Sequence, residues 1–168
     1  MMTAQPNAAL FSLAFAAAVL ACGGAAADPH QVKQGDITVS SRMVRTSFGN
    51  APNSAAYMVI SNSGAMPDKL IAARCACAAS VGIHETENTA GMSVMRSIGP
   101  IVIPAHGQVV FRPGGLHLML THLKEPLVEG GVQDITLVFQ RAGVVRASFH
   151  IRAQIPAGSA PPTRGVGH

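Results

Sequence analysis

Histidine and methionine residues form a spaced set between residues 84 and 119 of this chain. Ten residues separate His84 from Met95, twenty-one separate Met95 from His117, and Met119 lies two positions beyond His117. In a β-strand, residues i and i+2 project from the same face. His117 and Met119 would therefore point together, and neighbouring strands could bring His84 and Met95 to the same rim.

The residues between and around this pair support a strand with two different faces. Leu116, Leu118 and Leu120 alternate with His117 and Met119. The alternation predicts that the leucines face a hydrophobic core and that His117 and Met119 face a surface or rim. Taken singly, a methionine more often fills a gap in a core, so a metal site is expected only from the four residues together.

The types of ligand select the metal. Thioether sulfur is soft and neutral, which suits Cu(I) and offers little to Zn(II), Mg(II) or Ca(II). Imidazole adds a stronger donor that must be deprotonated to bind. Two histidines and two methionines would hold Cu(I) without a thiolate, so the site would survive an oxidising compartment and could release its ion to a thiolate-bearing partner.

The rest of the chain predicts an all-β fold that would position these residues. Short apolar or alternating segments recur every eight to twelve residues, separated by Gly, Pro and Asn, with no helical periodicity after residue 28. We expect one sandwich or barrel domain over residues 35–152, closed by a hairpin of its last two strands. The expected strands are Ile37–Met43, Ala55–Ser61, Lys69–Ala73, Ser80–His84, Ile101–Ile103, Val109–Arg112, Leu116–Thr121, Ile135–Gln140 and Val144–Ile151.

Composition narrows the function. The 168 residues are 48% hydrophobic and 12% charged, which excludes a disordered chain. The net charge of +4 comes with scattered arginines and few aromatic residues. Nucleic-acid binding would need clustered basic residues with aromatic stacking partners, so no nucleic-acid partner is expected. The scarcity of aromatics also predicts a core of Val, Ile, Leu, Ala and Met.

The N-terminal segment predicts an exported protein. Residues 8–22 form an apolar run of signal-peptide length, too short to span a bilayer. Two processing routes stay open: cleavage after Ala27 within residues 1–27, or lipidation of Cys22, because Val19–Cys22 resembles a lipobox. We expect a periplasmic protein, either free or anchored through Cys22. Residues 153–168 predict a disordered, low-complexity tail.

Several further residues have alternatives. Cys75 and Cys77 could form a second copper site or a redox pair, or could remain free thiols; their spacing predicts a strained ring if they are oxidised. Met92 could assist the metal site or be a spare loop residue. Glu85 could accept the ring hydrogen of His84 only if the strand ended at His84. The other histidines have no partner at ligand spacing: His30, His106, His122, His150 and His168.

The pattern His-x10-Met-x21-His-x-Met resembles the signature of the periplasmic copper chaperones called PCuAC. The surrounding blocks are also similar to that family, over roughly residues 35–150: Asn53–Tyr57, Asp68–Leu70, His84–Glu85, Met95–Arg96, Ile103–Ala105, Pro113–Leu120 and Leu123–Leu127. The resemblance implies a cupredoxin-like Greek-key β-barrel with one Cu(I) on His84, Met95, His117 and Met119. It also implies delivery of copper to a haem–copper oxidase. Cys75, Cys77 and His106 depart from the family pattern.

Other functions fit the residues less well. An enzyme would need an open coordination position and harder ligands, or a catalytic set that the sequence does not supply, so we expect no enzyme. A blue-copper carrier would need a cysteine ligand near His117, and a thiol–disulfide protein would be expected to use Cys-x-x-Cys. The alternative function is a periplasmic copper buffer or scavenger. The expected partner is an oxidase subunit or another copper chaperone, and the protein is expected to be a monomer.

Overall fold

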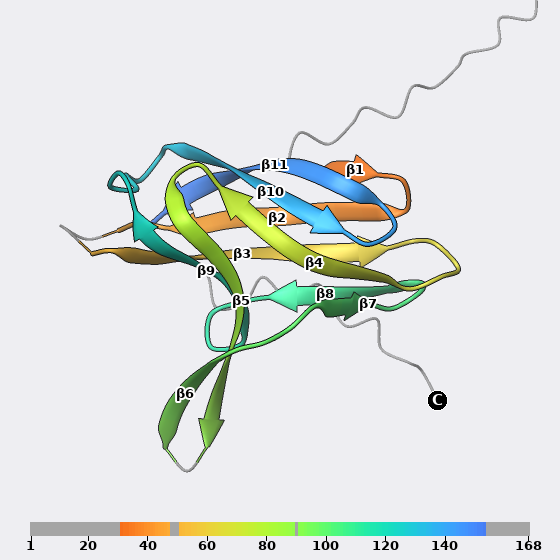
Figure 1. Ribbon diagram of the computed structural model, residues 1–168, viewed down its shortest axis with the longest axis horizontal. Coiled ribbons are helices and arrows are strands. Elements are labelled where there is room, and N and C mark those ends of the chain that lie inside the picture. Colours follow the sequence, from red (N-terminus) through yellow and green to blue (C-terminus); the bar gives the residue numbers. More distant parts are fainter. Residues whose placement is uncertain (1–30, 48–50, 90, 154–168) are drawn as a thin grey trace, which may run out of the picture.

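The structure is a computed structural model that describes residues 31–47, 51–89 and 91–153 (Figure 1). Within these ranges all regular structure is β, which confirms the all-β prediction, and no helix there could span a membrane. The strands are β1 (Val32–Gln34), β2 (Ile37–Arg45), β3 (Asn53–Asn62), β4 (Asp68–Cys75), β5 (Ala78–Thr89), β6 (Met92–Ser97), β7 (Ile101–Ile103), β8 (Gly107–Phe111), β9 (Leu116–Leu123), β10 (Val132–Phe139) and β11 (Gly143–Arg152).

The strands form one continuous sheet that folds over its own core. Its order is β6-β5-β9-β3-β2-β11-β10-β4-β7, with β1 added to β2 and β8 added to β3. All pairs are antiparallel except β11 with β2. The hairpin of β5 and β6 projects away from the body, so β6 forms an outer edge (Figure 1). The sheet therefore has a packed interior and an outer face that different strands share.

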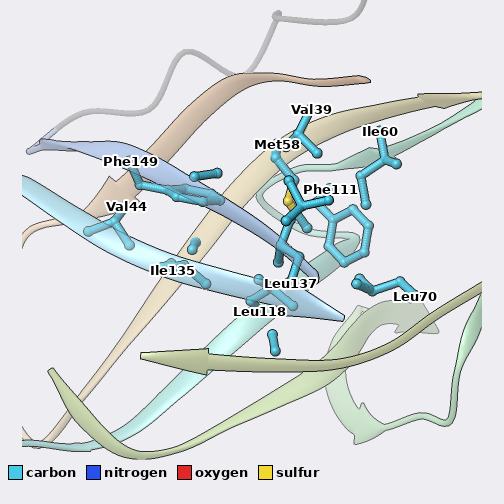
Figure 2. Close-up of a cluster of buried hydrophobic side chains, with 14 of the residues drawn as sticks. Val39, Val44, Met58, Ile60, Leu70, Phe111, Leu118, Ile135, Leu137 and Phe149 are labelled. Atoms are coloured by element: carbon cyan, nitrogen blue, oxygen red, sulfur yellow. The ribbon is translucent and has the colours of Figure 1, made fainter. Parts of the chain in front are cut away.

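Alternation of side chains builds the core. Along β11, buried residues alternate strictly with exposed ones from Val145 to Arg152, as expected of a strand with one face in the core. The interior is mainly aliphatic, as predicted, but Phe111 and Phe149 are also buried there (Figure 2). Phe139 is buried as well. All three phenylalanines in the described part of the chain thus contribute to the core, which the composition alone did not indicate.

Near the candidate ligands, one predicted strand boundary was wrong and one strand was missed. The segment expected to end at His84 continues to Thr89, and Met92–Ser97 forms a strand that was not predicted. The two strands pair from His84 with Ser97 to Thr89 with Met92. Every residue of β6 is exposed. A hairpin outside the core has no buried face, so it shows no apolar alternation in the sequence.

The predicted closing hairpin is present as β10 and β11. Their pairing runs from Val132 opposite His150 to Phe139 opposite Gly143. The buried carboxylate of Asp68 accepts hydrogen bonds from the backbone amides of Arg141 and Ala142 in the connecting turn, at 2.8 and 2.9 Å. This tie fixes the turn against the start of β4.

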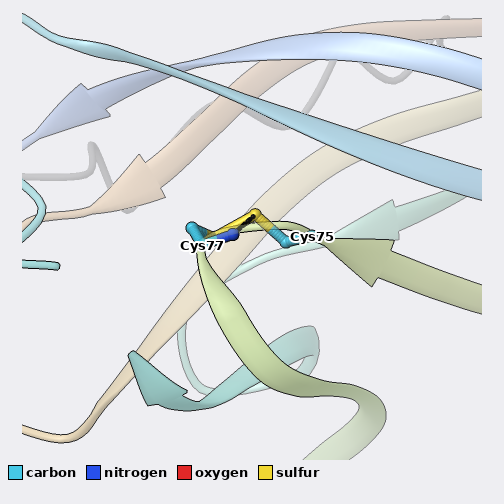
Figure 3. Close-up of a disulfide and its surroundings, with 2 residues drawn as sticks. All are labelled: Cys75 and Cys77. Carbon is cyan, nitrogen blue, oxygen red and sulfur yellow. Dashed lines mark hydrogen bonds between the residues drawn. A yellow bond between two sulfur atoms is a disulfide. The ribbon is translucent and has the colours of Figure 1, made fainter. Parts of the chain in front are cut away.

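Cys75 and Cys77 form a disulfide between the end of β4 and the start of β5 (Figure 3). Their Cα atoms lie 5.1 Å apart, within the ordinary range for disulfides. The expectation that the i, i+2 spacing brings the backbone too close for an ordinary disulfide is therefore wrong, and the two residues are not free thiols. The predicted signal segment of residues 1–27, with Cys22, and the tail from residue 154 lie outside the described residues.

Candidate metal centre

His84 and His117 lie directly opposite each other on neighbouring strands. They are register partners in the β5–β9 pair, so both imidazoles project from the same face of the sheet. Their ring centroids are 5.9 Å apart and the rings are tilted by 48°. Two residues separated by 33 positions in the sequence thus form one side-chain pair on the outer face.

Met119 belongs to the next row of the same face. Its register partners are Gly82 on β5 and Ala55 on β3. Glycine and alanine are the two smallest amino acids. A Cβ atom added at Gly82 would lie 3.0 Å from Nε2 of His84. A glycine inside a strand often marks such a close approach. Gly82 therefore leaves room for the His84 ring beside Met119.

Met95 reaches the same face from β6. It pairs with Thr86, two residues beyond His84 on β5, and alternation along β5 places Thr86 and His84 on one face. Met95 is 51% exposed, whereas His117 is only 4% exposed. The candidate ligands therefore share one face but differ widely in burial. The site was expected to be shallow, but one of its histidines, His117, is buried.

The predicted opposite face of β9 is also present. Leu118 and Leu120 are completely buried in the core, and Leu116 packs against it. The carbonyl of Gly115, just before this strand, accepts hydrogen bonds from the amide of Thr86 at 3.1 Å and from Nδ1 of His117 at 3.0 Å. One backbone oxygen thus fixes β5 against β9 and orients the His117 ring.

This contact determines which nitrogen of His117 can bind a metal. A carbonyl oxygen only accepts, so Nδ1 of His117 carries the hydrogen and Nε2 carries the lone pair. Nε2 is buried and has no hydrogen-bond partner within the described residues. A backbone carbonyl that holds the other ring nitrogen is the usual arrangement for a metal-binding histidine.

His84 has a matching unsatisfied atom. Its Nδ1 is buried without a hydrogen-bond partner in the described part of the chain. Desolvation, and secondarily the nearby His117, hold the pKa of His84 below its ordinary value. The neutral, ligating form is therefore favoured. A buried nitrogen without a partner costs free energy, and a bound metal ion would remove that cost.

The spacing of the two rings fits one shared ion. With a metal–imidazole bond of about 2 Å, two rings that bind the same ion have centroids roughly 5 to 6.5 Å apart, and the observed separation is 5.9 Å. The described residues contain no group of three or more His, Cys, Asp and Glu side chains that could hold a metal. The donor set at this face is thus imidazole and thioether, which favours a soft ion.

A pocket of about 320 Å³ opens beside these residues. Three of the candidate ligands line it, namely Met95, His117 and Met119. Most of the remaining wall comes from β2, β3 and the segments that flank them, and includes Arg45, Thr46, Asn53 and Tyr57. Thr86 of β5 also lines the pocket. The face with the candidate ligands is therefore accessible from solvent through a defined opening.

Other residues singled out from the sequence lie elsewhere. Glu85 pairs with Leu116 and Arg96 on the face opposite His84, because the strand continues beyond His84. Met92 lies on the other face of β6 from Met95, since three positions separate them. Cys75 and Cys77 precede β5, nine and seven positions before His84 in the sequence. Cys77 belongs to the core cluster and Cys75 packs against it.

Sequence reasoning missed two residues that support the centre. Gly82 could have been found, because a glycine within a Val-Gly-Ile strand pattern indicates close packing. The role of Gly115 could not, because a backbone carbonyl carries no signal in the sequence. Its turn does show one requirement: Gly114 has φ of +73°, which favours glycine.

This chain is similar to a known protein family and to a protein of known sequence. A family model described as "Putative lipoprotein LpqE-like" matches residues 37–151. The protein called "Putative lipoprotein Lxx21020" of Leifsonia xyli subsp. xyli is 34% identical over 86 residues, or 51% of this chain. That match spans 52% of the relative, so the two are similar over about half of the relative's length.

Solved structures of PCuAC domains share the fold. The copper-bound PCuAC domain from PmoF2 is 27% identical, with a TM-score of 0.65 over 74% of this chain and 99% of that one. The apo PCuAC domain from PmoF1 is 28% identical at the same TM-score and share of this chain, and is covered completely. Cu(I)-DR1885 from Deinococcus radiodurans is 26% identical, with a TM-score of 0.58 over 76% of this chain and 83% of that one.

These likenesses confirm the predicted resemblance to PCuAC and the cupredoxin-like all-β fold. The family model covers well over half of the 168 residues. The chain therefore belongs to the LpqE-like family and has the fold of a PCuAC domain.

Proposed function

We propose that this chain is an exported copper metallochaperone that binds one Cu(I) through His84, Met95, His117 and Met119. The observation that carries the proposal is the pair of buried, unpartnered nitrogens, Nδ1 of His84 and Nε2 of His117, on register partners of one face. The thioethers of Met119 and Met95 lie on the same face. Two of the similar structures, the PmoF2 domain and DR1885, are copper-bound, which supports the choice of metal.

The ligand set suits transport of Cu(I) rather than catalysis. Two neutral imidazoles and two thioethers bind a soft ion without adding negative charge. One ligand, Met95, is half exposed, so an acceptor can reach the ion by replacing it first. An acceptor with thiolate ligands would bind Cu(I) more strongly and would drive transfer. The binuclear copper centre of a haem–copper oxidase is the acceptor that we propose.

Transfer between proteins is the test of the chaperone role. The Cu(I)-loaded chain is mixed anaerobically with the apo copper domain of an oxidase, in the presence of a bulky Cu(I) chelator that cannot enter the pocket. Copper on the acceptor and not on the chelator would support direct delivery. Complete capture by the chelator would instead indicate a copper buffer, and the metal site would stand without the chaperone role.

We further propose that Cys22 anchors the chain to a membrane outside the cytoplasm, with residues 1–21 removed. The lipobox-like Val19–Cys22 and the lipoprotein description of the family support this anchor. Labelling with a fatty-acid analogue in cells is expected to mark the wild type but not Cys22→Ser. An unlabelled wild type whose mature form begins at Asp28 would show ordinary cleavage instead.

A further inference from the structure

The face that carries the candidate ligands continues across the sheet to two arginines. Met119 pairs with Ala55 on β3. The register of Met43 with Tyr57 and of Val44 with Ala56 places Arg45 next, beside Ala55. Arg152 on β11 is the register partner of Arg45. One row therefore runs from a metal ligand to two guanidinium groups.

The positive charge at this end is not balanced locally. Arg45 lines the pocket beside His117 and Met119, and none of the described residues that line this pocket is Asp or Glu. The ion pair between Arg96 and Glu87 lies on the β5–β6 hairpin, and no carboxylate within the described ranges lies within ion-pairing distance of Arg45. A bound Cu(I) ion would add further positive charge. The pocket therefore favours an anionic group.

The pocket also contains a hydrogen-bonding group without a partner. Thr46 is 9% exposed, lines the pocket, and its hydroxyl has no hydrogen-bond partner in the described part of the chain. The backbone is not free to turn it away, because the amide of Thr46 donates to the carbonyl of Arg152 at 3.0 Å. A buried hydroxyl left unpaired is costly, which indicates that a ligand completes its bonding.

Tyr57 supplies a second hydroxyl in the same wall. Its side chain is 8% exposed and lines the pocket close enough to Arg45 for the two to interact electrostatically. Desolvation raises the pKa of Tyr57, and Arg45 opposes this effect. The phenol thus keeps its proton and can donate it in a hydrogen bond. A planar guanidinium with two hydroxyl donors matches the two oxygens of a carboxylate.

We propose that this pocket is a carboxylate-binding subsite in which Arg45, Thr46 and Tyr57 hold a carboxylate group beside the metal centre. A cation is disfavoured by Arg45, and a purely apolar ligand would leave the Thr46 hydroxyl unpaired. One part of this proposal rests on the proposed function, namely that a metal centre lies next to the carboxylate. Arg45, Thr46 and Tyr57 do not bind copper themselves. The subsite can therefore be tested in protein without metal.

The test is a titration of the metal-free chain with acetate, followed by two-dimensional NMR. Saturable shifts are expected at Arg45, Thr46, Tyr57 and the neighbouring His117. Arg45→Gln is expected to weaken binding at least about tenfold, and Thr46→Val about threefold, in line with the loss of charged and neutral hydrogen bonds. Arg146→Gln is the matched control, since this exposed arginine on β11 pairs with Thr136 away from the pocket.

The subsite does not exist if acetate causes no saturable shift at concentrations about a hundredfold above a millimolar Kd. It also does not exist if Arg45→Gln and Arg146→Gln reduce binding equally, because the effect would then be one of net charge. Since no copper is present, either result leaves the metal-site proposal untouched, and a failed copper titration leaves this one untouched.

A second arm distinguishes the source of the carboxylate. The same titration is made with glutamate whose amino and α-carboxyl groups are blocked, which mimics a side chain of a partner protein. Binding equal to that of acetate would indicate that a partner's acidic side chain enters the pocket. Binding of acetate alone would indicate a small free acid. Either result requires the subsite, and the Arg45→Gln variant must weaken both.

Discussion

The two strands that flank β5 differ in how deeply they bury their candidate ligands. On one side, β9 holds His117 in the protein interior, with its ring oriented by the carbonyl of Gly115. On the other side, β6 carries Met95 on an edge hairpin in which every residue is exposed. His84, between them, is partly buried and has one nitrogen without a partner.

This difference in burial suggests that different ligands control the binding of Cu(I) and its release. A ligand that is buried and held by a hydrogen bond is preorganised, so little entropy is lost when the metal binds. An exposed thioether on an edge strand gains less, but an incoming ligand can displace it. We expect the histidine pair to determine how tightly Cu(I) is held, and Met95 to determine how quickly it leaves.

The largest effect is expected at the buried side. His117→Ala removes the preorganised ligand, so Cu(I) affinity should fall by more than the roughly 10- to 100-fold that loss of a partner of a ligand costs. Anaerobic competition titration measures this value. His122→Asn is the control on the same strand: His122 has φ of +54°, which asparagine tolerates. Equal affinity of the two variants would show that His117 is not a ligand.

A smaller effect is expected at the exposed side. Met95→Leu keeps the volume but removes the thioether, so affinity should fall about 10-fold, mostly through faster release of Cu(I). Met92→Leu is the matched control, because Met92 lies on the opposite face of the same strand. Stopped-flow transfer to a chelator compares the two release rates. If both variants release copper at the wild-type rate, Met95 contributes nothing to the site.

Gly82→Ala tests the space that His84 needs. The added Cβ would lie 3.0 Å from Nε2 of His84, so the ring must move by a few tenths of an ångström. We expect a several-fold loss of Cu(I) affinity, at the low end of the cost of disturbing a ligand's orientation. Gly99→Ala, where nothing lies within 4 Å, should bind as the wild type. An unchanged affinity in Gly82→Ala would mean that the ring adapts freely.

The pH dependence follows from His84. Its lowered pKa means that protons compete with Cu(I) for this ring only below the ordinary imidazole value of about 6.5. In the metal-free protein, the unfolded state takes up a proton first as pH falls below that value. The folded state should therefore lose stability as pH falls from about 6.5 to the lower pKa that His84 has in the folded protein. Above pH of about 6.5, His84 should not affect stability. NMR titration of the His84 ring tests this order, and a midpoint at or above 6.5 would contradict it.

The smallest effect is expected at the disulfide. Cys75 and Cys77 are bonded to each other between β4 and β5, and the proposed ligand set contains no sulfur from cysteine. The double variant Cys75→Ser, Cys77→Ser should therefore bind one Cu(I) with the affinity of the wild type. A loss of one-to-one binding in the titration would place a thiolate in the site.

The parts of this arrangement that the sequence could predict are those with a repeating physical signal. The alternation of leucines with His117 and Met119 correctly indicated two faces of one strand, and Ile101–Ile103 was placed correctly as a short strand. The hairpin with Met95 was missed, because a segment with no buried face has no apolar period. The burial of His117 was also missed, since the pocket wall that covers it comes from distant strands.

X-ray absorption of the Cu(I)-loaded double cysteine variant tests the central claim most directly. The account predicts one copper per chain, with a first shell of two nitrogen and two sulfur neighbours. In His117→Ala, one nitrogen should disappear, and in Met95→Leu, one sulfur. A copper shell without sulfur in the double cysteine variant, or a shell that neither substitution changes, would contradict the assignment of His84, Met95, His117 and Met119 as the metal centre.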